Sequence, residues 1–284
     1  MSGFYWIASY PKSGNTWLRL ALAALLHPDK ALPSDANNGF APNASQLYDL
    51  EEALDVESSD LSLAELEALR PVAYRMLAQQ ATRPLFRKVH DAWTHTAGGE
   101  PLFPPEVTLG TFYIVRDPRD VAVSWAHFAV QPLDAAVNSL CNPAGLLLGR
   151  PDRARFNLPQ RLSSWGGHVQ SWLEAPGRPC CLLRYEDMLA DPLGSLRRAA
   201  LYAGIPHDQA DLERAVAATD FGVLQQAEAR HGFDGGQPKG VRFFRTGRAG
   251  GWRDWLTPRQ ADLLAASQGA MMRRLGYLEA DNLE

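Results

Sequence analysis

Apolar residues recur along the chain in two patterns that alternate: short continuous runs, and longer stretches with helical spacing. The short runs predict β-strands, and the amphipathic stretches predict helices between them. The predicted strands span 4–9, 86–90, 111–115 and 180–185. The predicted helices span 16–26, 63–80, 119–128, 162–174, 193–203, 208–219 and 258–275. Short strands alternating with helices are typical of a parallel sheet that is covered on both faces, so we expect one α/β domain over residues 1–284.

Three stretches lack this periodicity and are rich in Pro, Gly or Asn. They span 28–43, 130–160 and 230–248. Long loops in a compact domain are often functional, and a parallel sheet binds its ligands at the carboxyl ends of its strands. We therefore expect these stretches to form the walls of a substrate site. Alternatively, these stretches are surface loops without a functional role.

The first predicted strand leads into a turn that can hold an anion. Residues 10–17 read Tyr-Pro-Lys-Ser-Gly-Asn-Thr-Trp and run directly into the first predicted helix. Unpaired N–H groups at a helix N-terminus, together with the helix dipole, favour a bound phosphate or sulfate. Lys12 adds a positive charge, and Ser13 and Thr16 add hydroxyl donors. An ordinary strand-to-helix turn with a surface lysine is the alternative.

This turn differs from the common nucleotide-binding loops. A P-loop places its lysine after the second glycine, whereas Lys12 precedes Gly14, and no Gly-x-Gly-x-x-Gly motif is present. The turn instead resembles the 5′-phosphosulfate loop of the sulfotransferases that use PAPS (3′-phosphoadenosine 5′-phosphosulfate). That resemblance assigns to PAPS binding the residues Lys12, Ser13, Gly14, Asn15, Thr16 and Trp17.

The end of the third predicted strand carries a second candidate anion site. Arg116 lies at the strand end, and Ser124 follows about two turns into the next helix. An arginine fork with a hydroxyl group can grip a phosphate. The run R-D-P-R-D-V-A-V-S resembles the family's 3′-phosphate site, which implies that Arg116 and Ser124 bind this phosphate and that Ser124 restrains Lys12 before both substrates are bound. A salt bridge from Arg116 to Asp117 or Asp120 is the alternative.

A histidine ends the second predicted strand, in the sequence Arg-Lys-Val-His at 87–90. An imidazole with a pKa of about 6.5 can accept a proton at neutral pH. The family has a similar Lys-x-His here, and the resemblance makes His90 the general base and Lys88 a group that neutralises charge during transfer. A structural role for a buried His90 is the alternative, in which case His95 or His127 could be the base.

Two later segments resemble the nucleotide site of the same family. Tyr185, in the sequence Arg-Tyr-Glu-Asp, is expected to reach the adenine. Phe221 and Trp17 are expected to stack on the base from opposite sides, although Phe221 could equally be a core residue. Both assignments come from the resemblance.

Residues 242–252 resemble the family's C-terminal signature F-x-R-K-G-x-x-G-D-W. The signature departs at two positions, with Thr246 where lysine is common and Gly251 where aspartate is common. The threonine removes a positive charge from the 3′-phosphate site, and we expect Arg248 to restore it. The resemblance assigns to cofactor binding the residues Arg245, Thr246, Gly247 and Arg248.

Composition and charge narrow the class of protein. The chain has 284 residues, of which 46% are hydrophobic and 21% charged, as in ordinary globular proteins. The net charge of −4 argues against general nucleic-acid binding. The three cysteines form neither a disulfide framework nor a zinc pattern. No run approaches the ~18 apolar residues of a membrane span and no signal peptide is evident, so we expect a soluble cytoplasmic protein.

The resemblance covers residues 6–257, with its motifs in the family's order, and looks closest to bacterial tailoring sulfotransferases of secondary metabolism. It implies a P-loop-NTPase-like sulfotransferase fold and transfer of a sulfuryl group from PAPS, without a metal, to a hydroxyl or amine of a small molecule. The alternatives are a phosphoryl-transfer enzyme on a P-loop-like scaffold and a non-catalytic module that binds a bisphosphorylated nucleotide.

Two expectations concern the acceptor and the assembly. Aromatic residues in the irregular stretches and near the strand ends are expected to line a pocket for an apolar or aromatic-bearing acceptor; they are Phe40, Trp93, Phe128 and Phe156. Residues 253–262 resemble, in degraded form, a short dimerisation sequence of some relatives, which leaves a homodimer open.

Overall fold

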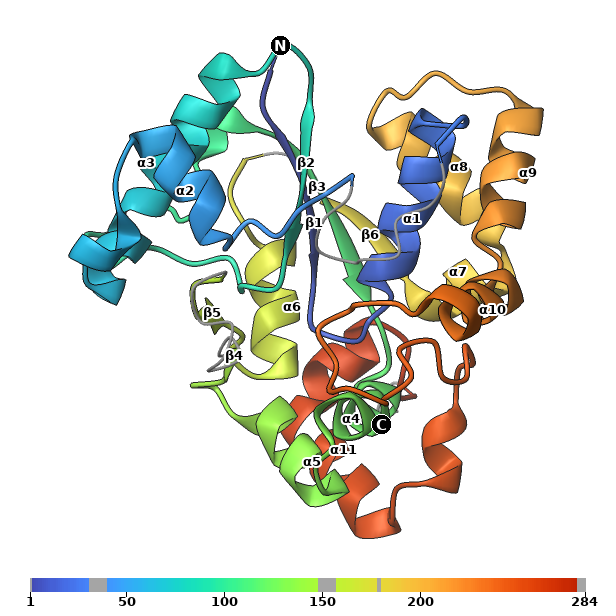
Figure 1. The fold of residues 1–284 in the computed structure, drawn as a ribbon. Helices are drawn as coiled ribbons and strands as arrows, with labels where there is room; N and C mark the ends of the chain where they lie inside the picture. The colour runs from blue at the N-terminus through green and yellow to red at the C-terminus, as the bar shows by residue number, and fades with distance from the viewer. Residues whose placement is uncertain (1, 31–39, 148–156, 178–179, 280–284) are drawn as a thin grey trace.

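Four parallel strands form the central sheet of this chain, of which the computed structural model describes residues 2–30, 40–147, 157–177 and 180–279 (Figure 1). The order across the sheet is β2-β1-β3-β6, and each neighbouring pair is parallel. The strand bounds are Phe4–Ser9 for β1, Leu85–Val89 for β2, Thr108–Val115 for β3 and Cys180–Arg184 for β6. The predicted parallel α/β sheet is thus confirmed.

Both faces of the sheet are buried, because large apolar side chains alternate along its inner strands. In β1, Trp6 and Ala8 belong to one hydrophobic core and Ile7 to the other. In β3, Tyr113 and Ile114 divide between the same two cores. A strand that is apolar on both sides needs a helix layer on each side, and the structure provides both.

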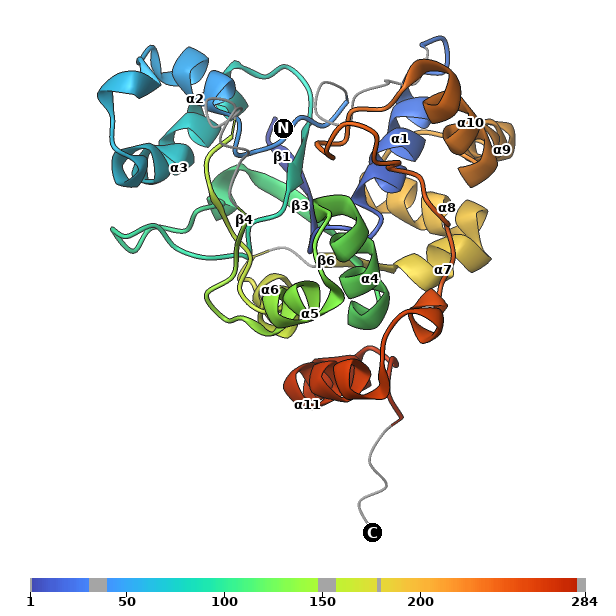
Figure 2. The same cartoon turned by 60° about the horizontal axis from the view of Figure 1, so that its bottom comes forward.

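Helices form one layer on each face of the sheet and a third group at the end to which the strands point (Figures 1 and 2). One layer holds α1 (Asn15–Leu26), α8 (Pro192–Tyr202) and α9 (Gln209–Ala218). The other holds α2 (Leu47–Leu54), α3 (Leu63–Gln80) and α6 (Trp165–Leu173). The third group holds α4 (Pro118–Ala129), α5 (Leu133–Cys141) and α11 (Pro258–Arg274). No helix in the described ranges is long and apolar enough to cross a bilayer.

The sequence pattern missed some helices, including α2, α5, α7 (Tyr185–Ala190) and α10 (Phe221–His231). The α5 helix lies inside a stretch that was predicted to be irregular. The Pro and Gly residues of that stretch flank the helix and do not interrupt it, so a helix can form there. Tyr185 opens α7, so the fourth strand of the sheet ends one residue earlier than predicted.

The carboxyl edge of the sheet is where segments distant in sequence meet. The chain between α10 and the 3₁₀ helix Gly251–Asp254 crosses this edge (Figure 1). The antiparallel pair β4 (Leu146–Leu147) and β5 (Gln160–Arg161) lies beside it. Two further 3₁₀ turns, Ser58–Asp60 and Pro105–Val107, lie elsewhere in the fold.

Candidate active site

A cavity of about 1050 Å³ lies at the carboxyl edge of the sheet. Ligand pockets are roughly 300–1,000 Å³, so this one is at the large end of that range. All the predicted site residues except Ser13 and Arg248 lie on its wall. They are Lys12, Gly14, Asn15, Thr16, Trp17, Lys88, His90, Arg116, Ser124, Tyr185, Phe221, Arg245, Thr246 and Gly247.

The turn between β1 and α1 presents backbone N–H groups to this cavity. Gly14 precedes α1 with a φ of 104°, a conformation that glycine adopts without strain. A Cβ atom at Gly14 would lie only 2.7 Å from the ring of Tyr185, so glycine is also required by space. Among the described residues no side chain caps α1, whereas α3 and α9 carry capping boxes. The N–H groups of the first turn can therefore bind an anion.

Two polar side chains of the turn are not directed at a ligand in the cavity, although the sequence predicted that they bind an anion. Asn15 donates its Nδ2 hydrogens to Ile7 O at 2.8 Å and Ser9 Oγ at 3.2 Å, which ties the turn to β1. Ser13 is fully buried off the cavity wall, and its hydroxyl finds no hydrogen-bond partner within the described ranges. We therefore expect both residues to serve an anion through their backbone N–H groups.

Lys12 holds its ammonium group between two aromatic rings at the cavity wall. The Nζ atom lies 4.2 Å from the ring centroid of Phe128 and 4.1 Å from that of Phe243, which are cation–π distances. Burial, aided by the nearby cations Arg116 and Arg245, lowers the pKa of Lys12 to about 7. A bound dianion would favour the charged form and raise this pKa again.

Arg116 crosses from the end of β3 to the turn and to the C-terminal segment. Its Nη1 and Nη2 groups donate to Lys12 O at 3.3 Å and Arg248 O at 3.1 Å. Its guanidinium carbon lies 4.2 Å from the centroid of the Tyr185 ring. No carboxylate in the described part of the chain pairs with it, so the charge of Arg116 stays available to an anion. Ser124 shares the same cavity wall.

The aspartates that could have paired with Arg116 have other partners. Asp117 forms an ion pair with Arg119 at 2.7 Å. Asp120 is buried and accepts hydrogen bonds from the backbone N–H groups of Gly250 and Trp252 at 2.7 and 2.8 Å. Asp120 thereby anchors the C-terminal segment over the cavity, a role that the sequence analysis missed because its partners lie far along the chain.

The aromatic residues expected at the adenine all lie on the cavity wall. Trp17 donates its Nε1 hydrogen to Thr219 O at 3.0 Å, which fixes the indole. A Cβ atom at Gly247 would lie 2.5 Å from the ring of Phe221, so this glycine lets the backbone pass directly against that ring. Together with Tyr185 these rings provide stacking surfaces for a base.

Not all residues of the C-terminal signature line the cavity. Arg245 lies on the wall, and its pKa is lowered by partial burial and by the neighbouring cations Arg116 and Arg248. The side chain of Arg248, by contrast, is 52% exposed, pairs with Asp254 and is not on the wall. It contacts the site through its carbonyl oxygen and lies close enough to act electrostatically on Arg245, and replacement of the missing lysine charge by Arg248 stays a prediction. Arg245 is the cation that adjoins Thr246.

His90 follows β2 and is buried at the cavity. Its Nδ1 atom lies 2.8 Å from the carbonyl oxygen of Ser9. A carbonyl can only accept, so Nδ1 carries the proton and Nε2 keeps a free lone pair. Burial, with the positive charge of Lys88, lowers the pKa of His90 well below its ordinary value, so the ring is neutral. A neutral imidazole with a free Nε2 is the form that a general base requires.

The alternative bases lie elsewhere. His95 is exposed, His127 packs with its ring centroid 4.9 Å from that of Trp255, and neither is on the cavity wall. His168 is fully buried and donates from Nε2 to the carbonyl oxygen of His90 at 3.1 Å. Among these histidines, only His90 lies on the cavity wall.

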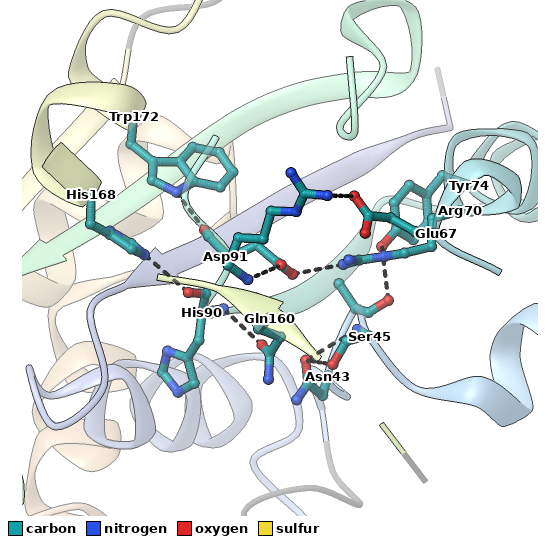
Figure 3. Close-up of polar contacts among 12 residues, drawn as sticks. Asn43, Ser45, Glu67, Arg70, Tyr74, His90, Asp91, Gln160, His168 and Trp172 are labelled. Carbon is teal, nitrogen blue, oxygen red and sulfur yellow. Dashed lines mark hydrogen bonds and ion pairs between the residues drawn. The ribbon is translucent and has the colours of Figure 1, made fainter. Parts of the chain in front are cut away.

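A buried polar network supports the backbone at His90 (Figure 3). Arg70 of α3 pairs with Asp91 at 2.7 Å, and both side chains are 2% exposed. Asp91 also accepts from the N–H of Arg161 in β5 at 2.9 Å, and its carbonyl oxygen accepts from Trp172 Nε1 at 2.9 Å. Asp91, the residue that follows the candidate base, therefore connects this point of the backbone to α3, β5 and α6.

Substituting Asp91 by alanine should lower the free energy of unfolding by about 3–5 kcal/mol, because it leaves the Arg70 charge buried without a partner. Urea denaturation of the wild type and D91A measures this loss. The control is Glu174→Ala, which breaks a pair with Arg274 in which both side chains are 51% exposed. Water screens that pair, so E174A should change stability far less. Equal stability of D91A and E174A would contradict the role given to this network.

Of the aromatic residues expected to line an acceptor pocket, one lies on the cavity wall. Phe128 lies on the wall, but Phe40 packs 4.7 Å from Phe86 and Trp93 packs 4.9 Å from His95, both away from it. Phe156 lies outside the described residues. The wall also carries four amide side chains that the sequence analysis missed: Asn43, Gln46, Asn157 and Gln160.

Within the described ranges no group of three or more His, Cys, Asp or Glu side chains is placed to hold a metal ion. The carboxylates on the cavity wall are Asp220 and Asp234, and each accepts from a nearby backbone N–H group.

Residues 4–276 match the family model described as the sulfotransferase domain. Cytosolic sulfotransferase 10 of Arabidopsis thaliana is 25% identical over 274 residues, covering 90% of this chain and 74% of the relative. Sulfotransferase 1C2 of Oryctolagus cuniculus is also 25% identical, covering 91% of this chain and 79% of the relative.

Solved structures share the fold. Mouse sulfotransferase SULT7A1 complexed with PAP superposes with a TM-score of 0.60 at 18% identity, covering 96% of this chain and 86% of that one. Retinol dehydratase in complex with androsterone and the inactive cofactor PAP gives a TM-score of 0.62 at 21% identity, covering 99% and 83%.

Proposed function

The chain belongs to the sulfotransferase domain family, and on that premise we propose that it transfers the sulfuryl group of PAPS to a hydroxyl of a small molecule. The product would be a sulfate ester and adenosine 3′,5′-bisphosphate (PAP). The observation that carries the proposal is a neutral His90 with a free Nε2 in the same cavity as Lys12 and Arg116. These residues supply a base, a cation for the leaving phosphate and a cation for a second phosphate.

The cosubstrate would lie along the carboxyl edge of the sheet. Its 5′-phosphosulfate would sit against the N–H groups of residues 12–17 and against Lys12. Its 3′-phosphate would contact Arg116, Ser124 and Arg245, which all lie on the wall and of which the two arginines are electrostatic neighbours. Its adenine would stack among three aromatic rings of the wall: Trp17, Tyr185 and Phe221.

The transfer needs one proton acceptor and several fixed donors. His90 Nε2 takes the proton of the acceptor hydroxyl as the oxygen attacks sulfur. A new oxygen–sulfur bond forms while the bond from sulfur to the bridging phosphate oxygen breaks, and PAP leaves. Negative charge grows on the leaving and peripheral oxygens, where Lys12, Lys88 and the N–H groups of the turn stabilise it. Holding both reactants in one cavity supplies much of the remaining acceleration.

A single-turnover assay tests the reaction class. The enzyme is mixed with PAPS labelled with ³⁵S and with a pool of phenols, alcohols and sugars, and label in the organic products is counted. We expect transfer to at least one acceptor. Binding of PAP without transfer would favour a non-catalytic nucleotide-binding module, and label transfer from [γ-³²P]ATP in its place would favour a phosphoryl-transfer enzyme.

The range of pH in which kcat/KM for PAPS is high should be narrow and shifted to the acidic side. His90 has a pKa below the ordinary value of 6.5 and stays neutral into mildly acidic solution, so activity should persist below pH 6.5. Lys12, with a pKa of about 7, loses its charge as the pH rises, so kcat/KM should fall above about pH 7.

Rate profiles from pH 5 to 9 measure both limbs. The variant Lys12→Arg keeps a positive charge throughout this range, so its alkaline limb should disappear even if its rate is lower. A wild-type kcat/KM that is level from pH 7 to 9 would contradict the lowered pKa of Lys12.

A further inference from the structure

Two buried amide side chains flank His90 with donor groups that nothing in the described structure uses. Asn43 and Gln160 are each 4% exposed, and both lie on the cavity wall. No hydrogen bond to Asn43 Nδ2 or Gln160 Nε2 is formed within the part of the chain that the structure describes. Neither nitrogen is among the fully buried side-chain atoms that lack a partner, so both open onto the cavity, where a bound ligand can accept hydrogen bonds from them.

The orientation of both amides is fixed by their other ends. Gln160 Oε1 accepts from the backbone N–H of His90 at 3.3 Å. Asn43 Oδ1 accepts from the backbone N–H of Ser45 at 3.2 Å and from its hydroxyl at 3.1 Å. A backbone N–H can only donate, so the oxygen atoms must face it and the NH₂ groups must point the other way. Figure 3 shows both amide nitrogens on the same side as the imidazole of His90.

The rest of this part of the wall defines what can bind there. Gln160 of β5 pairs with Leu147 of the antiparallel strand β4, and Leu147 also lies on the wall. Trp125 and Phe128, stacked 5.7 Å apart, add an apolar surface. Lys88, a cation on the same wall, acts electrostatically on His90. A ligand group here must therefore accept hydrogen bonds, and a cationic amine would meet donors and a like charge.

From this geometry we infer that the acceptor carries a second oxygen on the carbon next to the hydroxyl that is sulfated, as in a catechol, a vicinal diol or a sugar. This inference rests on the proposed sulfuryl transfer and names the substrate class for the same site. The reacting hydroxyl gives its proton to His90 Nε2. The neighbouring oxygen accepts from Gln160 Nε2 and Asn43 Nδ2 and stays unmodified. The apolar body of the acceptor lies against Trp125 and Leu147.

Matched acceptors test this class directly. Catechol is compared with phenol, and octyl β-glucoside with 1-octanol, by kcat/KM with labelled PAPS. In each pair that reacts, the member with the neighbouring oxygen should be favoured by roughly tenfold to a hundredfold, because the other member leaves the amide donors unpaired. Equal kcat/KM within both pairs, or turnover of phenol and octanol alone, would overturn the inference. Absence of turnover with all four while PAP binds would also overturn it.

Isosteric variants assign the effect to the amides. Gln160→Glu and Asn43→Asp keep the oxygen that holds the backbone and replace only the NH₂ donor. Each should reduce the preference within a pair by about tenfold or more. Damage to the base or to the cofactor site affects both members equally and cancels in the ratio. The control Gln170→Glu adds a carboxylate at an exposed position of α6, outside the cavity, and should keep the wild-type ratio.

Calorimetric titration with PAP separates this inference from the proposed function. Tight binding of PAP with no preference within the acceptor pairs contradicts the acceptor class alone. Absence of PAP binding contradicts the proposed function itself, and the acceptor class falls with it.

Discussion

Replacing His90 by alanine should lower kcat by roughly 10²–10⁴-fold, the usual contribution of general base catalysis. The hydrogen bond from Nδ1 to Ser9 O fixes the tautomer, so the lost group is the free Nε2 lone pair. No other histidine on the described cavity wall can take its place. Initial rates at saturating PAPS and acceptor measure this change.

Binding of PAP tests whether the loss is one of chemistry. The site proposed for the nucleotide lies on Arg116, Lys12 and the turn, so H90A should bind PAP nearly as tightly as the wild type. His95→Ala is the matched control, since His95 is exposed and off the wall, and it should keep full turnover. Full turnover in H90A would show that the base lies elsewhere.

Replacing Lys12 by methionine should lower kcat by roughly 10²–10³-fold, because a fixed donor aimed at developing charge is a large term in catalysis. Methionine retains the apolar stem that packs between Phe128 and Phe243 and removes the ammonium group. The loss should appear in kcat as well as in KM for PAPS, and steady-state kinetics separate the two.

The control for Lys12 is Lys30→Met, which removes the charge of an exposed lysine outside the cavity and should leave the rate unchanged. Lys12→Arg should recover part of the lost rate, since it restores the charge with different geometry. A K12M variant with raised KM and unchanged kcat would mean that Lys12 binds ground state and transition state equally.

The sequence predicted those parts of the site in which the functional residues lie directly beside the strand or helix that positions them. The turn at residues 10–17 joins a strand to a helix, and its glycine, lysine and hydroxyl residues can be read without knowledge of distant residues. Arg116 and His90 end predicted strands, so a parallel sheet must bring them to one edge. These placements are confirmed by the structure, whereas their catalytic and binding roles remain predictions.

The parts that the sequence did not predict depend on contacts between distant segments. Asp120 holds Gly250 and Trp252, which follow it by more than a hundred residues. Gln160 of β5 accepts from the N–H of His90, and Asn43 pairs with Lys88, two residues before it; both come from stretches without periodicity. The ion pair between Arg248 and Asp254, on the exposed side of the C-terminal segment, was also not predicted. Such contacts follow from tertiary packing, which propensity and spacing do not encode.

The ranking of PAP against adenosine 5′-monophosphate by calorimetry tests the central claim most directly. The two nucleotides differ only in the 3′-phosphate, which Arg116, Ser124 and Arg245 are proposed to hold. We expect the wild type to bind PAP roughly ten to a hundred times more tightly, as charge-assisted hydrogen bonds to one phosphate predict. Equal affinity for the two, or no measurable heat with PAP, would contradict the account.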